Sequence, residues 1–69
     1  MEVIGQQLRT RRQAVGLSQA ALAAKAGVSR VFVEKIEAGA RTPSWGTLAR
    51  LAQALGCRVV LTLVPRRGK

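Results

Sequence analysis

The chain has 69 residues, which allows one small domain, and its 12 Lys and Arg against 3 acidic residues give a formal net charge of +9. It contains no His and no Asp; its acidic residues are Glu2, Glu34 and Glu37, and Cys57 is its one thiol. These residues cannot assemble a catalytic triad, a carboxylate dyad or a multi-ligand zinc site within one chain. We therefore expect a protein that is not an enzyme and that has no cofactor, no metal and no small-molecule substrate.

Apolar residues make up 48% of the chain, which is typical of a folded domain rather than of a charged disordered tail. No apolar run approaches the roughly 18 residues of a membrane span, and we expect no signal peptide. A lone Cys cannot form an internal disulfide, which fits a reducing cytoplasm. The composition therefore predicts a basic cytoplasmic binding module, away from the membrane, with a polyanion as its natural partner.

Gly and Pro divide the chain into five segments, of which the first four have helical character. The first places Ile4, Leu8 and Val15 on one helical stripe. Each of the next three follows a serine suited to an N-cap, and all four end near a glycine suited to a C-terminal stop. The caps and stops are Ser18, Ser29 and Ser44, and Gly16, Gly27, Gly39 and Gly56. We predict helices over residues 2–15, 19–26, 30–38 and 45–55, with a loop over 40–43.

The last segment, Arg58 to Val64, changes to the pattern of a β-strand, because it is rich in β-branched and apolar residues and ends at Pro65. Everything before it is predicted to be helical, so this strand has no partner in its own chain. Its donors and acceptors are satisfied if it pairs with the same strand of a second protomer about a two-fold axis. The alternative is an extended tail that lies on the chain's own helices. We predict a homodimer whose interface is made by Val59, Val60, Leu61, Thr62, Leu63 and Val64.

Residues 19–36 combine two short predicted helices with a sharp turn, AGVS, over residues 26–29. Gly27 stands where the chain must turn, and glycine adopts a positive φ at no steric cost. The apolar residues are spaced so that the two helices pack against each other. Such a pair is the helix-turn-helix arrangement, in which the second helix enters the major groove of DNA.

The run LSQAALAAKAGVSR from Leu17, followed by IEAG from Ile36 and PSWGTL from Pro43, resembles the Cro/C1-type (Xre) helix-turn-helix family of bacterial and phage regulators. The resemblance covers Ile4 to Leu55, most of the chain. It implies a mainly α, lambda-repressor-like domain of four to five helices, here with one C-terminal β-strand pairing across a dimer. The chain then divides into a DNA-binding domain over residues 1–56, a dimerisation strand over 57–65 and a basic mobile tail over 66–69.

The resemblance also implies roles for individual residues. Gln19, at the start of the second predicted helix, matches a phosphate-binding position, and Ser29 lies near the DNA backbone. Arg12 and Glu37 match a pair that forms an internal salt bridge beside the DNA in similar repressors. The positions that face base edges are matched by Arg30, Val31 and Lys35.

The helical period of residues 28–36 supports the base-reading positions independently. The inward positions are Val28, Val33 and Ile36. The outward positions are Arg30, Val31, Glu34 and Lys35. An Arg can bond guanine O6 and N7 bidentately, and a Val can contact a thymine methyl group. The alternative is that Arg30 and Lys35 are solvated surface charges, and Lys35 could equally meet a phosphate.

Further contacts with the DNA backbone are expected from basic residues near the ends of helices that flank the recognition helix. These residues are Arg12, Lys25 and Arg41. Phe32 lies at the edge of the inward face, so it either packs partly against the core or wedges against the sugar-phosphate backbone. Trp45 is expected to be a packing residue that covers the preceding loop, and Cys57 to be inert.

The C-terminal strand narrows the resemblance to antitoxins of the HipB type, in which paired strands of two protomers build a small sheet. That resemblance implies a dimer that binds a palindromic operator in its own promoter, at the bacterial nucleoid, and also holds a kinase toxin of the HipA type. Antitoxins of the HigA type and free-standing repressors share the helical domain and stay open as alternatives. A further alternative is a sequence-indifferent nucleic-acid-binding protein, because a charge of +9 attracts any polyanion.

Overall fold

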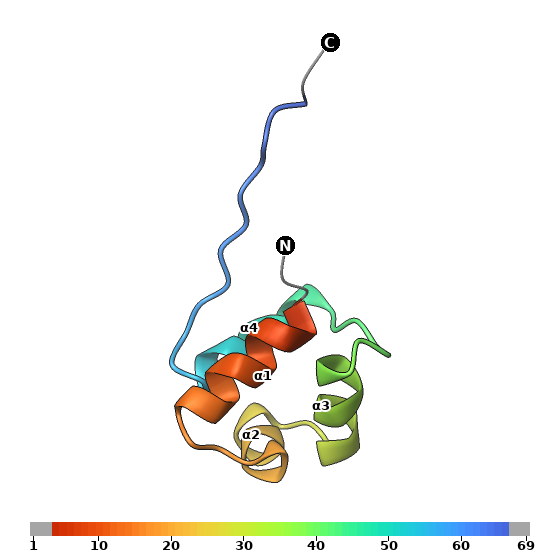
Figure 1. Cartoon of the computed structure of the whole chain (residues 1–69), viewed down its shortest axis with the longest axis vertical. Helices are drawn as coiled ribbons and strands as arrows, with labels where there is room; N and C mark the ends of the chain where they lie inside the picture. Colours follow the sequence, from red (N-terminus) through yellow and green to blue (C-terminus); the bar gives the residue numbers. More distant parts are fainter. Residues whose placement is uncertain (1–3, 67–69) are drawn as a thin grey trace.

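The computed structural model describes residues 4–66 and has four α-helices in that range, which confirms the mainly α fold (Figure 1). The helix ends that can be compared agree with the predicted ones to within one residue. The predicted helix start at residue 2 and the tail residues 67–69 lie outside the described residues. No described helix is long and apolar enough to cross a membrane. The helices are α1 (Ile4–Ala14), α2 (Gln19–Ala26), α3 (Arg30–Glu37) and α4 (Trp45–Ala54).

Helices α2, α3 and α4 each begin at a serine whose hydroxyl accepts a hydrogen bond from the backbone N–H three residues later. Such bonds satisfy N–H groups that have no partner within the helix. The three predicted N-caps are therefore confirmed. Ser18 accepts from Ala21 at 3.0 Å, Ser29 from Phe32 at 3.1 Å and Ser44 from Thr47 at 3.2 Å.

All four helices end in the same way. The residue after a glycine donates a hydrogen bond to a carbonyl five residues earlier, as from Val28 to Ala23 at 3.0 Å. Gly27 adopts the left-handed backbone conformation, with φ of 74°, and reverses the chain between α2 and α3 at the predicted turn. The predicted stops Gly16, Gly39 and Gly56 have φ of 77°, 78° and 73°.

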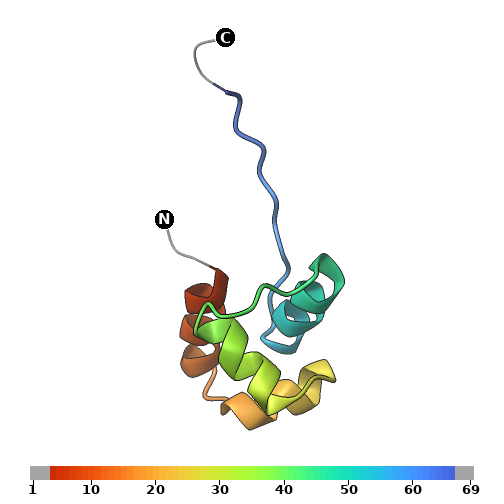
Figure 2. The ribbon, with the colours of Figure 1, turned by 90° about the vertical axis from the view of Figure 1, so that its right-hand side faces the viewer.

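The core lies where α2, α3 and α4 meet, and α1 packs on α3 (Figures 1 and 2). The predicted inward residues Val33 and Ile36 are buried there. The predicted stripe of α1 is confirmed at Leu8, whereas Ile4 and Val15 are 36% and 40% exposed, because Ile4 is the first residue of α1 and Val15 follows its last. The most deeply buried side chains are Leu22, Val33, Ile36 and Leu51.

Gly5 marks a close approach of two helices that the sequence pattern does not reveal. The residue is buried in the first turn of α1. A Cβ atom at this position would collide with the carbonyl oxygen of Ile36, in the last turn of α3. The backbones of α1 and α3 therefore pack directly on each other at this point, and only glycine leaves room for it.

Trp45 corrects one prediction. It was expected to pack over the loop, but the residue is 56% exposed. The core takes Leu51 and Ala52 from the second half of α4, and Leu55 from its C-cap. Trp45 is the first residue of α4, so it lies beyond the part of the helix that the core covers.

Residues 57–66, here called the C-terminal segment, are extended. The segment first passes beside α1 and α4 and then leads away from the helices, as Figures 1 and 2 show from two directions. Within residues 4–66 the segment forms no ladder with another strand. Strand pairing across a dimer therefore stays a prediction. The alternative of a tail lying on the chain's own helices is wrong beyond Val60, because Leu61 and Leu63 are 70% and 86% exposed.

Candidate nucleic-acid interface

Helix α3 has one buried face and one exposed face, as the helical period predicts. Val33 and Ile36 are buried, and Val28 is half-buried just before the helix. Val31 is 47% exposed, and its neighbours on the outer face are exposed as well. The structure thus brings the predicted base-reading residues together on one side of a short, capped helix, namely Arg30, Val31 and Lys35.

A buried ion pair joins the last residue of this helix, Glu37, to Arg12 of α1, which confirms the predicted pair. The Nε and Nη2 atoms of Arg12 donate to the two carboxylate oxygens of Glu37 at 2.7 and 3.0 Å. The Arg12 and Glu37 side chains are 11% and 4% exposed. The third Arg12 nitrogen, Nη1, donates to the carbonyl of Leu17 at 2.9 Å. The pair thus joins α1, the α1–α2 loop and the end of α3.

The surroundings of the pair shift both pKa values in favour of the charged forms. Burial alone raises the pKa of Glu37. Hydrogen bonds from Arg12 and Gln19, with the charges of Arg12 and Arg9, outweigh burial and hold the Glu37 pKa below its usual value. The hydrogen bond to Glu37 likewise raises the pKa of Arg12. Glu37 is therefore ionised at neutral pH despite its burial.

Gln19 links this pair to the recognition helix. Its Nε2 donates to Glu37 Oε1 at 3.1 Å, and its Oε1 accepts from Arg30 Nη1 at 3.4 Å. Arg12, Glu37, Gln19 and Arg30 thus form one chain of hydrogen bonds that runs from α1 to the exposed face of α3. The sequence predicts both ends of this chain, but not that Gln19 connects them.

An ion pair on the outer face of α3 was also missed. Arg30 Nη1 lies 3.5 Å from Glu34 Oε1, and both side chains are about half exposed, at 50% and 55%. The spacing of four residues along a helix is the signal that could have revealed it. An exposed pair at this distance is weak. The pair therefore holds the Arg30 guanidinium only weakly.

The start of α2 borders a surface depression of about 230 Å³ whose lining includes Arg9, Gln19 and Glu34. Arg9 was not predicted to contact DNA, although it lies one helical turn before Arg12 on α1. In the structure Arg9 and Gln19, the residue predicted to bind a phosphate, line the same depression. Arg12 differs from the other predicted phosphate contacts, since all three of its guanidinium nitrogens already donate within the chain.

The remaining predicted backbone contacts lie in two places. Ser29 uses its hydroxyl oxygen as the cap of α3 and can still donate its proton to a phosphate. Phe32 is half-buried against the core, and the Arg41 guanidinium lies 5.2 Å from the centre of its ring. Lys25 lies apart from these residues, in a depression that it shares with Arg50 between α2 and α4.

The family described as helix-turn-helix domain matches residues 3–63. The chain belongs to the helix-turn-helix domain family. It is 40% identical over 60 residues to y4dL, an HTH-type transcriptional regulator of Sinorhizobium fredii, and the match covers 87% of this chain and 31% of y4dL. The chain therefore spans about a third of the length of that relative. The resemblance to Cro/C1-type regulators that the sequence indicated is thereby confirmed.

Two solved helix-turn-helix structures share the arrangement. The restriction-modification controller protein C.AhdI from Aeromonas hydrophila superposes with a TM-score of 0.76 at 42% identity, over 78% of this chain and 82% of that one. The P22 c2 repressor, solved in complex with a synthetic operator, superposes with a TM-score of 0.78 at 33% identity, over 83% and 86% of the two chains. These two proteins and y4dL are a controller protein, a repressor and a transcriptional regulator, and none of these is an enzyme.

Proposed function

We propose that this helix-turn-helix chain is a sequence-specific DNA-binding transcriptional repressor. The observation that carries the proposal is the outer face of α3, where Arg30, Val31 and Lys35 lie together while the opposite face is fixed in the core. A helix held in this way enters the major groove with its N-terminal residues toward the bases. The net charge of +9 supplies the attraction to phosphate.

In this mechanism the side chains divide into two groups. Arg30 reads a guanine through O6 and N7, and Val31 contacts a thymine methyl group. Gln19 binds a phosphate at the start of α2, and the Arg30 guanidinium lies beside it, 3.4 Å from its Oε1. Contacts with the DNA backbone that carry no sequence information come from Arg9, Lys25, Ser29, Phe32 and Arg41. The three charged residues among them also make binding depend on salt.

We propose further that the protein acts as a homodimer on a palindromic operator. The C-terminal segment supports this, because its exposed apolar residues and unpaired backbone favour pairing with the same segment of a second copy. Two recognition helices related by a two-fold axis contact half-sites about one helical turn, roughly 34 Å, apart. The expected operator is an inverted repeat with this spacing upstream of the protein's own coding region.

The same segment supports a role as the antitoxin of a HipBA-type module. An apolar extended segment directly after the last helix is the feature that resembles HipB-type antitoxins, and in this role the dimer also holds a HipA-type kinase toxin. Co-purification with a co-expressed HipA-type kinase, with loss of its phosphorylation activity, tests this role. Capture of an RNA-cleaving toxin would identify a HigA-type antitoxin. If neither toxin is captured, the protein is a free-standing repressor.

Titration against the upstream DNA and a scrambled duplex at about 0.15 M salt tests the DNA-binding proposal. A specific reader prefers its operator by at least about 10³. Equal binding to both duplexes would contradict the proposal and identify a sequence-indifferent nucleic-acid-binding protein.

Two matched variants separate base reading from phosphate binding. Arg30→Ala removes a bidentate guanine contact, so we expect it to weaken operator binding by about 1–3 kcal/mol and to relax the preference at one base pair. Arg41→Ala removes one phosphate contact, so we expect it to weaken operator and scrambled DNA alike and to lower the salt slope by about 1. If Arg30→Ala affected both duplexes equally, the base-reading role would be wrong.

A further inference from the structure

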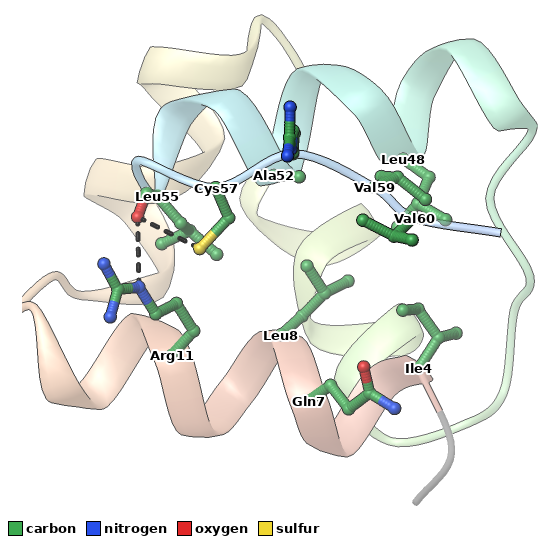
Figure 3. A pocket seen from close by; sticks show the side chains of 11 residues that line it. Ile4, Gln7, Leu8, Arg11, Leu48, Ala52, Leu55, Cys57, Val59 and Val60 are labelled. Carbon is green, nitrogen blue, oxygen red and sulfur yellow. Dashed lines mark hydrogen bonds between the residues drawn. The ribbon is translucent and has the colours of Figure 1, made fainter. Parts of the chain in front are cut away.

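An open apolar cavity of about 290 Å³ lies between α1, α4 and the start of the C-terminal segment (Figure 3). Its walls come from α1, α4, Leu55 and residues 57–60, and no residue of α3 lines it. Arg11 stands at one end, where its Nε donates to the Leu55 carbonyl at 3.2 Å. The apolar walls include Ile4, Leu8, Leu48, Ala52, Val59 and Val60.

The C-terminal segment cannot fill this cavity within its own chain. Val59 and Val60 form one of its walls, and from Leu61 onward the segment leads away from the helices (Figures 1 and 2). To return, the chain would need a tight turn between Leu61 and Val64. The sequence LTLV contains no Gly, Asn, Asp or Pro, the residues that favour such turns.

We infer that Leu63 of a second copy of this chain fills the cavity. The inference rests on the strand-paired dimer proposed above and adds its register and its contact with the helices. In an antiparallel pair, residues that lie opposite each other point to the same face of the sheet. In a symmetric pair, one residue must therefore lie opposite its own copy, and the two-fold axis passes between the two copies. When residues 58–64 pair over their full length, that residue is Leu61. Leu63 of the second copy then lies opposite the half-buried Val59, at the mouth of the cavity.

Charge does not oppose a second copy at this segment. Two chains of net charge +9 repel each other over most of their surfaces, but residues 59–65 carry no charge. This register keeps the two Arg58 side chains at opposite ends of the strand pair. Each copy offers one cavity and one Leu63, so a two-fold arrangement fills both cavities and association stops at the dimer.

Disulfide cross-linking of the full-length chain tests the register. The variants are made in a Cys57→Ser background, so that each chain carries a single cysteine. A cysteine at the self-paired residue lies opposite its own copy, where the two Cα atoms are within disulfide range, and it therefore cross-links the dimer. We expect rapid oxidation to a covalent dimer for Leu61→Cys and little for Thr62→Cys. Cross-linking through Thr62→Cys instead would overturn the inference and leave the strand-paired dimer standing.

Sedimentation equilibrium tests the occupant of the cavity. Leu63→Ala removes two buried side chains per dimer, so we expect the dimer Kd to rise about 100-fold. Val64→Ala changes an equally exposed residue on the other face of the strand, and we expect a rise of less than about fivefold. Ile4→Ala, on the cavity wall, should also weaken the dimer, and its effect should be smaller when Leu63 is already truncated.

The outcomes separate this inference from the proposed function. Equal effects of Leu63→Ala and Val64→Ala, or an unchanged Kd for Ile4→Ala, would overturn the inference without touching the dimer. A protein that stays monomeric, with no cross-link at either position, would overturn both the inference and the proposed dimer. Operator binding by α3 is measured by the separate DNA titration.

Discussion

The helical body, residues 4–55, and the C-terminal segment satisfy their backbone and apolar groups in different ways. In the body, serine caps, glycine stops and a common core provide partners within the chain. In the C-terminal segment, Leu63 and Val64 are 86% and 81% exposed, and the described chain offers no ladder partner. The difference shows that the body is packed by its own residues, whereas the segment has no such packing partner within residues 4–66.

Leu61→Asp should give the largest effect and should separate the two regions. In the proposed dimer it places two like charges opposite each other in an apolar strand pair, so we expect the dimer Kd to rise by at least about 1,000-fold. Sedimentation equilibrium measures the dimer, and circular dichroism of the monomer should show unchanged helix content. A dimer that survives this change would place the interface on the helices.

Glu37→Ala tests the body. It leaves the guanidinium of Arg12 and the amide of Gln19 without their acceptor, so we expect a loss of about 3–5 kcal/mol in the free energy of unfolding. Urea denaturation measures it. Glu34→Ala is the matched control, because its exposed pair with Arg30 should contribute less than about 1 kcal/mol. Similar losses for both variants would show that the buried pair is not a main support of the fold.

Gly5→Ala tests the direct packing of α1 on α3. The added methyl group meets the Ile36 carbonyl, so we expect the two helices to separate at a cost of about 1–3 kcal/mol in the free energy of unfolding. The control is Gly46→Ala, which adds the same group to α4 where it meets no other part of the chain within 4 Å. We expect that variant to be more stable by about 0.5–1 kcal/mol. In thermal melts we expect Gly5→Ala to lower the Tm and Gly46→Ala to raise it.

Acidification should weaken the body more than the strand pairing. The pKa of Glu37 is lower in the folded chain than its usual value, so its stabilising contribution is complete above the usual pKa and is lost as the pH falls through the folded one. We expect the urea midpoint to fall progressively once the pH drops below about 5. A Glu37→Gln variant should lose most of this dependence. Residues 59–65 contain no ionisable side chain, so the strand pairing itself should not follow pH.

The fold of the body could be predicted because its signals are local. Ser18, Ser29 and Ser44 fix the helix starts within three residues of sequence, and the glycine stops are equally local. The two faces of α3 follow from the helical period alone. The pairing of Arg12 with Glu37, 25 residues apart, came from the family resemblance and not from the pattern.

What the sequence did not predict depends on contacts between distant segments. Gly5 looks like any helical glycine until the path of α3 is known. The bond from Arg11 to the Leu55 carbonyl joins residues 44 apart, and no spacing rule reveals it. Trp45 was assigned to packing because tryptophan usually packs, but its place at the first turn of α4 leaves it exposed.

The hydrogen-bonded chain from Arg12 to Arg30 sets a rule for redesigning the operator preference. Suppose that the outer-face residues of another recognition helix replace those of α3. Arg30 is then lost, and Gln19 loses the donor to its Oε1. Since Gln19 also holds Glu37, the mismatch would reach the buried carboxylate behind the helix. Because Glu37 is the last residue of α3 and pairs with Arg12, the smallest unit that can be exchanged intact is α3 together with residues 12 and 19.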